Sequence, residues 1–169
     1  DTIGKRFLIL DGAMGTLLQT YNLKESDWDF KVGCNEILNI TRPDIIKGIH
    51  LDYLKAGADI TKTNSFGALP WVLEEYNLQD KTYEIAKMAA KNAKSAKDEI
   101  ESVYKCQKYV AGSLGPGTKL ASLNQIDFDT MYDGYFLAAC GLIDGGVDLI
   151  LIETFQDPLQ IKAALNGCF

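Results

Sequence analysis

The chain has 169 residues, of which 47% are hydrophobic, and a formal net charge of −6. This composition suits one α/β domain with a sizeable core, and the acidic balance gives no electrostatic attraction for nucleic acid or an anionic membrane. No apolar run approaches the roughly 20 residues of a membrane-spanning helix, so we expect a soluble, cytoplasmic protein with no membrane partner.

The cysteines and the first residue narrow the possible class of protein further. The four cysteines have spacings that match no zinc pattern, and His50 is the only histidine, so free thiols are expected and no metal ligand is assigned. The sequence begins at Asp1 without a methionine, and we expect a trimmed piece of a longer chain. The cysteines are Cys34, Cys106, Cys140 and Cys168.

The first predicted element is a strand over residues 7–10, an apolar run that Asp11 closes. Gly12 and Gly15 then allow the loop to turn tightly and to approach a small ligand closely. The loop lacks both the ending of a phosphate loop and the glycine spacing of a dinucleotide site. An ordinary turn is the commoner explanation of such a sequence.

A helix is predicted to start at residues 41–44, with Thr41 as a candidate N-cap and a proline in the first turn. Its apolar face continues to Leu54, and Gly57 ends it. His50 lies off the centre of that face, so we expect a surface or partly packed residue rather than a catalytic base.

The second strand is predicted over residues 59–63, where Lys62 interrupts the apolar pattern, and it leads into the polar Asn64 and Ser65. A short helix over residues 71–76 and a long alanine-rich helix over residues 80–100 follow. The third strand, residues 109–113, opens into a loop rich in glycine and proline, which favours a rigid pocket floor. A further helix is predicted over residues 128–143.

The fourth predicted strand, residues 149–152, is a continuous apolar run that ends at Glu153 and predicts burial on both faces. Glu153 lies at the carboxyl end of this strand, where α/β folds bind ligands, although a structural salt bridge would explain it equally well. Residues 56–66 align with residues 145–155 without gaps, which indicates repeated βα units with polar ends on one rim. A last helix starts near Asp157.

Strand ends near residues 11, 64, 113 and 153 indicate four βα units. Because a (β/α)8 barrel takes about 250 residues, residues 1–169 are either an open four-stranded parallel sheet or the first half of a TIM barrel. A half-barrel would leave unpaired strand edges, through which the chain could self-associate.

Four segments, taken together, resemble the homocysteine-binding domain of cobalamin-dependent methionine synthases. The match runs in order over nearly all of the chain, and four motifs at this spacing are specific where each alone is weak. The segments are Asp-Gly-Ala-Met-Gly-Thr at 11–16, Thr-Asn-Ser-Phe-Gly at 63–67, Gly-Ser-Leu-Gly-Pro at 112–116 and Ile-Glu-Thr-Phe at 152–155.

The resemblance implies a (β/α)8 barrel that binds homocysteine and transfers a methyl group to its thiol, with methylcobalamin as the donor. In that family three cysteines hold a zinc ion that activates the thiol, since metal coordination yields the thiolate at neutral pH. Those cysteines belong to the second half of the barrel, so the zinc ligands are expected beyond Phe169. Cobalamin and folate domains of the same longer protein are the implied partners.

The resemblance assigns amino-acid recognition to this part of the chain. Asp11 and Glu153 match the substrate-binding acids of the family and suit the ammonium of homocysteine. For its carboxylate we expect backbone N–H groups of Gly12–Ala13 and Ser65–Phe66, with Asn64 adding a neutral hydrogen bond at the rim. No catalytic residue is assigned, and we expect residues 1–169 to be inactive alone.

One other class of function stays open from the sequence, and a third lacks support. A self-contained α/β module that binds a small molecule or a second chain, without catalysis, would need no further cysteines. A sugar-phosphate isomerase lacks support, because there is no phosphate loop and no strong base other than Glu153.

Overall fold

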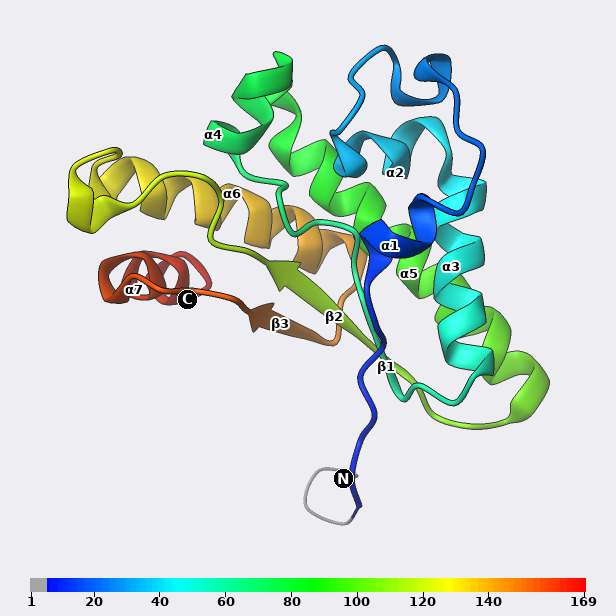
Figure 1. Cartoon of the computed structure of the whole chain (residues 1–169). Helices are drawn as coiled ribbons and strands as arrows, with labels where there is room; N and C mark the ends of the chain where they lie inside the picture. Colours follow the sequence, from blue (N-terminus) through cyan, green and yellow to red (C-terminus); the bar gives the residue numbers. More distant parts are fainter. Residues whose placement is uncertain (1–5) are drawn as a thin grey trace.

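A parallel sheet runs through the computed structural model, which describes residues 6–169 (Figure 1). Its strands are β1 (Ile60–Lys62), β2 (Tyr109–Leu114) and β3 (Leu149–Ile152), in the order β1-β2-β3. Thr61 pairs with Val110, and Gly112 pairs with Ile150. The α/β class and the parallel sheet are therefore confirmed. The domain predicted over 1–169 includes residues 1–5, which lie outside the described residues.

The strand predicted over residues 7–10 is wrong as a strand, because only a single parallel bridge joins Leu10 to Ile60. The segment still runs beside β1 (Figure 1), with hydrogen bonds of 2.7 Å from Asp59 N–H to the Ile9 carbonyl and 2.9 Å from Asp11 N–H to the Ile60 carbonyl. Phe7 is 97% exposed and Ile9 60% exposed. The apolar run is present, but most of its side chains are left exposed by the described residues.

Helices fill the connections between the strands. The predicted long helices are present, and the helix that follows residue 157 begins with Pro158 in its first turn. Two short α-helices of the described residues were not predicted, one after Gly12 and one before Arg42. The helices are α1 (Met14–Leu18), α2 (Leu38–Thr41), α3 (Pro43–Lys55), α4 (Pro70–Leu73), α5 (Thr82–Tyr104), α6 (Phe128–Gly145) and α7 (Pro158–Gly167).

The start of α3 corrects one sequence prediction. Arg42, not Thr41, precedes the first helical residue, and it makes no side-chain cap. Thr41 ends α2 instead, and its hydroxyl donates to the Ile37 carbonyl at 3.2 Å. Gly57 follows the end of α3 with φ of +112°, a left-handed conformation that glycine adopts without steric cost.

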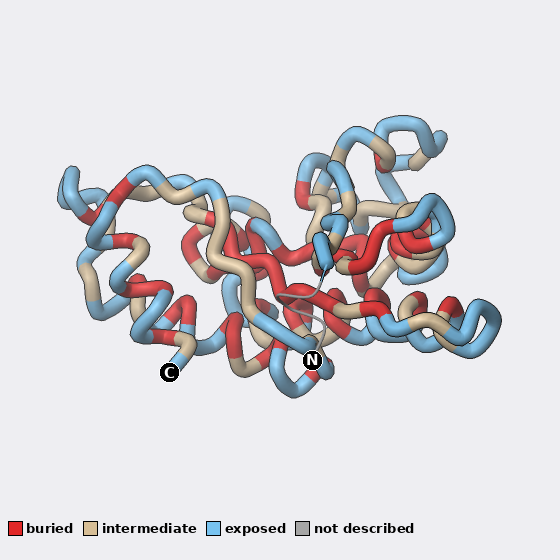
Figure 2. The backbone as a smooth tube through the Cα atoms, turned by 90° about the horizontal axis from the view of Figure 1, so that it is seen from below, coloured by how far each residue is buried: buried red, intermediate tan, exposed pale blue. Residues whose placement is uncertain are grey.

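The core lies between the helices and the sheet, and the buried segments run through the middle of the molecule (Figure 2). α5 packs between α3 and α6, and α6 packs between α5 and α7. The rings of Trp71 and Tyr135 meet edge to face, with centroids 5.2 Å apart. α5 and α6 approach very closely, since a Cβ added at Gly141 would lie 2.6 Å from the Tyr83 carbonyl oxygen.

The prediction that β3 is buried on both faces is wrong for this chain. Leu149 is exposed, and the other three residues of the strand are only partly buried. β3 is an edge of the sheet within residues 6–169, so one side of it has no strand neighbour there. None of the helices in residues 6–169 has the length and apolar character to cross a bilayer.

Candidate functional site

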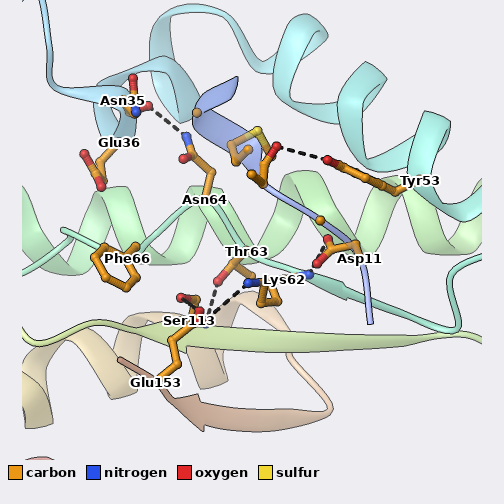
Figure 3. Close-up of a pocket in the computed structure, with 14 residues that line it drawn as sticks. Asp11, Asn35, Glu36, Tyr53, Lys62, Thr63, Asn64, Phe66, Ser113 and Glu153 are labelled. Atoms are coloured by element: carbon orange, nitrogen blue, oxygen red, sulfur yellow. Dashed lines mark hydrogen bonds and ion pairs between the residues drawn. The ribbon is translucent and has the colours of Figure 1, made fainter. Parts of the chain in front are cut away.

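The carboxyl ends of β1, β2 and β3 and the loop after Asp11 converge on one cavity of about 280 Å³ (Figure 3). This volume lies at the small end of the range for ligand sites, roughly 300–1,000 Å³, and fits a molecule of amino-acid size. Its lining comes from six separate parts of the chain: Asp11, Gly12, Ala13, Met14, Gly15, Asn35, Glu36, Tyr53, Lys62, Thr63, Asn64, Phe66, Ser113 and Glu153.

Glu153 leaves β3 at its carboxyl end and is held on both carboxylate oxygens. The Ser113 hydroxyl donates to Oε1 at 2.6 Å, and Lys62 Nζ lies 3.3 Å from Oε2 (Figure 3). Its own N–H donates to the Leu114 carbonyl at 3.1 Å. Thr154 follows with φ of +68°, which β-branched residues rarely adopt. The backbone therefore turns sharply just after the carboxylate, and Glu153 faces the cavity from a fixed position.

Asp11 faces the cavity from the opposite side of β1. Its Oδ2 accepts hydrogen bonds of 2.8 Å from the Thr61 hydroxyl and from the Lys62 N–H. Burial raises the pKa of Asp11 above the ordinary carboxyl value, and these hydrogen bonds oppose that shift. Oδ1 is buried and has no partner among the described residues. An N–H donor from a ligand would satisfy that acceptor.

Tyr53 of α3 holds the loop that carries Gly12 and Ala13. Its hydroxyl donates to the Ala13 carbonyl at 3.0 Å (Figure 3). A Cβ at Gly12 would lie 2.7 Å from the Tyr53 hydroxyl oxygen. A side chain at position 12 would therefore push the Tyr53 ring away from the loop, and this close contact defines one wall of the cavity.

The opposite wall is the short 3-10 helix Asn35–Ile37. Asn64 Nδ2 donates to the Asn35 carbonyl at 2.8 Å, and Asn39 Nδ2 donates to the Asn64 carbonyl at 2.7 Å. Glu36 Oε1 accepts the Gly67 N–H at 2.8 Å. Burial raises the pKa of Glu36. These bonds fix the segment after β1 against this short helix.

The structure brings six of the seven predicted site residues to the cavity: Asp11, Gly12, Ala13, Asn64, Phe66 and Glu153. Ser65 is the exception, because it lies fully buried beneath the cavity. Its hydroxyl donates to the Ser113 carbonyl at 2.7 Å, and its N–H donates to the Thr63 carbonyl at 2.9 Å. Ser65 therefore supports the strand ends from below, and its N–H already has a partner.

The sequence analysis did not assign several lining residues to the site. For one of them, Lys62, the sequence does contain a feature that points to the site. Lys62 breaks the apolar pattern of its strand, and a charged residue inside a buried strand has to face something polar. Ser113 is in the predicted third strand without any feature that marks it. Tyr53 and Glu36 reach the cavity through tertiary contacts across more than twenty residues, which no local pattern records.

His50 corrects another prediction, because it is fully buried rather than at the surface or partly packed. Its Nδ1 lies 2.8 Å from the Thr61 hydroxyl oxygen, and that hydroxyl donates to Asp11. Desolvation lowers the pKa of His50 to about 4, so the imidazole is neutral at physiological pH. Since Thr61 uses its proton on Asp11, Nδ1 is the donor in the bond to Thr61.

The cysteines of the chain do not fit a zinc site. Among residues 6–169 no three His, Cys, Asp or Glu side chains gather as a metal would require. Cys34 is buried next to Glu36, and burial raises the pKa of its thiol to about 11. All four thiols are free of disulfide bonds.

Comparison with known protein families and sequences gives consistent matches. Residues 8–168 match the family model described as homocysteine S-methyltransferase. The chain is 44% identical over 167 residues to a methionine synthase from Mycobacterium tuberculosis and 42% identical to one from Mycobacterium leprae. Each alignment covers 99% of this chain and 14% of the relative.

Solved structures match over a larger share of their length. The oxidized form of the homocysteine methyltransferase MmuM from Escherichia coli superposes with a TM-score of 0.76 at 27% identity, over 93% of this chain and 56% of that protein. The metallated form superposes with a TM-score of 0.75 at 27% identity, over 94% of this chain and 58% of that protein.

Proposed function

Because this chain belongs to the homocysteine S-methyltransferase family, we propose that it is the part of a methionine synthase that binds homocysteine for methyl transfer to its thiol. The chain spans 14% of the length of the curated relatives it matches. The proposed reaction is that of the longer protein, and residues 1–169 supply recognition of the amino acid.

The observation that carries the proposal is the placement of two carboxylates, Asp11 and Glu153, on one cavity of amino-acid size. An ammonium between them would satisfy the unpartnered Oδ1 of Asp11 and would share Glu153 with Lys62. Hydrogen bonds that involve a charged group contribute roughly 1.5–3 kcal/mol each. Gly12, Ala13, Asn64 and Phe66 complete the proposed binding residues, and Ser65 acts through the support it gives to Ser113.

We further propose that this chain supplies the first four βα units of a (β/α)8 barrel, with the bridged segment before Asp11 in the position of the first strand. The superposition on 56% of MmuM supports this, as does the exposed edge at β3. The remaining strands would cover Leu149 and the apolar residues that precede Asp11. A self-contained α/β module that uses these edges to bind a second copy is the alternative.

The metal and the methyl donor are assigned outside residues 1–169. Zinc, where the family holds it, stabilises the thiolate of the substrate, and the described cysteines do not gather as its ligands would. Methylcobalamin and folate are proposed to bind other domains of the longer protein. Free thiols at all four cysteines agree with the cytoplasmic location that we propose.

The test is calorimetry of homocysteine binding together with zinc content, on this chain and on a version extended by about 150 residues, enough to complete a barrel of about 250–300 residues. Zinc and tight homocysteine binding only in the extended protein would support the proposal. Stoichiometric zinc or tight binding in residues 1–169 would show that the short chain is complete. Absence of homocysteine binding in the extended protein would overturn the proposed function.

A further inference from the structure

Lys62 brings the one cationic side chain to a cavity lining that otherwise carries three carboxylates. Among the described residues that line the cavity, the charged side chains belong to Asp11, Glu36, Glu153 and Lys62. Lys62 Nζ lies 3.3 Å from Glu153 Oε2, and the two side chains are 24% and 21% exposed. This ion pair therefore lies in the cavity wall rather than on the open surface (Figure 3).

An α-amino acid brings two opposite charges to the cavity at once, because its ammonium and its carboxylate are attached to the same carbon. Asp11 and Glu153 attract the ammonium. The same carboxylates repel the carboxylate of the ligand, and in a partly desolvated cavity that repulsion is stronger than in water. A cation close to the acids that hold the ammonium would offset this repulsion and would add to any backbone N–H groups that the ligand carboxylate reaches.

Lys62 lies close to both acids, where such a cation would act. Its N–H donates to Asp11 Oδ2 at 2.8 Å, and its Nζ pairs with Glu153, so one residue contacts both acids. A lysine ammonium has three N–H donors. The bond to Glu153 uses one of them, which leaves donors for a second carboxylate on the cavity side.

We propose, on the basis of the function proposed above, that Lys62 binds the α-carboxylate of the ligand while it remains paired with Glu153. Lys62 is then a specificity-determining residue, because it selects zwitterionic α-amino acids over simple amines. The acids Asp11 and Glu153 account for binding of an ammonium. Lys62 accounts for the requirement that a carboxylate accompany it.

The experiment compares two ligands by calorimetry on the full-length protein: homocysteine and its decarboxylated analogue, an aminopropanethiol that keeps the ammonium and the thiol. Lys62→Gln should weaken homocysteine binding by about tenfold to a hundredfold, the loss of one charged hydrogen bond. Binding of the aminopropanethiol should be unchanged or tighter, since Glu153 loses a competing cation. Lys62→Arg should retain most of the preference for homocysteine.

The matched control is Lys94→Gln, which removes a lysine from an exposed ion pair with Asp98 on α5. It should change neither affinity. Equal loss for both ligands in Lys62→Gln, or no loss for homocysteine, would overturn the role of Lys62 and leave the proposed function standing. If the unaltered protein does not bind homocysteine, the proposed function fails and this inference fails with it.

Discussion

Asp11 and His50 are joined through the hydroxyl of Thr61, which accepts from one and donates to the other, with both distances at 2.8 Å. The connection runs from the buried face of α3, across β1, to the cavity. It places a neutral imidazole behind the carboxylate that we propose to bind an ammonium. Because Thr61 has one proton to give, the imidazole keeps that proton directed at Asp11.

Asp11→Asn should weaken homocysteine binding in the full-length protein by about tenfold or more, because the amide lacks the charge. The stability of the Asp11→Asn variant should not fall, since Asn Oδ1 can accept the bonds from Thr61 and Lys62. The folded-state pKa of Asp11 is raised, so its contribution to stability is present below the ordinary carboxyl range and is lost as pH rises through the raised value.

Denaturant unfolding of this chain against pH measures the effect of Asp11→Asn on stability. The variant should gain on the unaltered chain as pH rises through that interval. The exposed Asp80 provides the control, Asp80→Asn, which should follow the unaltered protein in both assays. A variant that loses stability at neutral pH while it keeps full affinity would contradict the placement of Asp11 in the site.

Glu153→Gln should weaken homocysteine binding by about tenfold or more in the full-length protein, because the ammonium loses one charged partner. Ser113→Ala should have a smaller effect, since it removes only the hydroxyl that donates to Glu153. Calorimetry under identical salt measures both, with the exposed Glu84→Gln on α5 as control. Unchanged affinity in Glu153→Gln would remove Glu153 from the site.

His50 should make the stability of this chain depend on pH in a defined direction. Its pKa is lowered from 6.5 to about 4 by burial, so the stability it supports is present above pH 6.5 and is lost as pH falls toward 4. The full loss is up to about 3 kcal/mol, at about 1.4 kcal/mol per pH unit.

Urea unfolding between pH 7 and pH 4 tests this dependence, with His50→Gln as the variant that should lack this part of the slope. His50 is the only histidine in the chain, so its imidazole resonances report its titration without overlap. An imidazole that titrates near 6.5 in the folded protein would contradict burial of His50.

Gly141→Ala should destabilise this chain by about 1–3 kcal/mol, the usual cost of overpacking a core. The added Cβ would lie 2.6 Å from the Tyr83 carbonyl oxygen and 2.9 Å from Ala86 Cβ, so α5 and α6 would have to separate. Gly48→Ala on α3 is the matched control, because its Cβ would come no closer than 3.9 Å to the Tyr21 hydroxyl. Thermal unfolding should show a lower midpoint for Gly141→Ala and an equal or higher one for Gly48→Ala.

The internal repeat shows how much of the fold could be predicted from the sequence. Gly57 and Gly146 both adopt positive φ, as the alignment of the two units would require. Asp59 and Asp148 also have the same role, since each carboxylate accepts a backbone N–H from the preceding strand segment, at 3.0 Å from Ile9 and 2.8 Å from Val110. Such a bond depends on a glycine stop, an acid and a strand in fixed order, and all three are local features.

The errors came from contacts that no local pattern records. His50 appeared peripheral because its place on α3 is off the centre of the apolar face, yet α3 packs over β1 with Thr61 beneath it. β3 appeared buried because its residues are apolar, yet burial depends on neighbours on both sides. An apolar composition predicts that a strand is stable when it is buried. Whether it is buried depends on the elements that pack against it.

The cavity draws its walls from the loop after Asp11, the end of β1, the end of β2 and the end of β3. No single βα unit contains enough of it to hold a ligand, so a bound amino acid would stabilise the assembled sheet as a whole. Amides in all three strands should then gain the same protection from hydrogen exchange when the ligand binds, including those far from it. Ligand binding would therefore be coupled to the cooperative unfolding of the whole sheet.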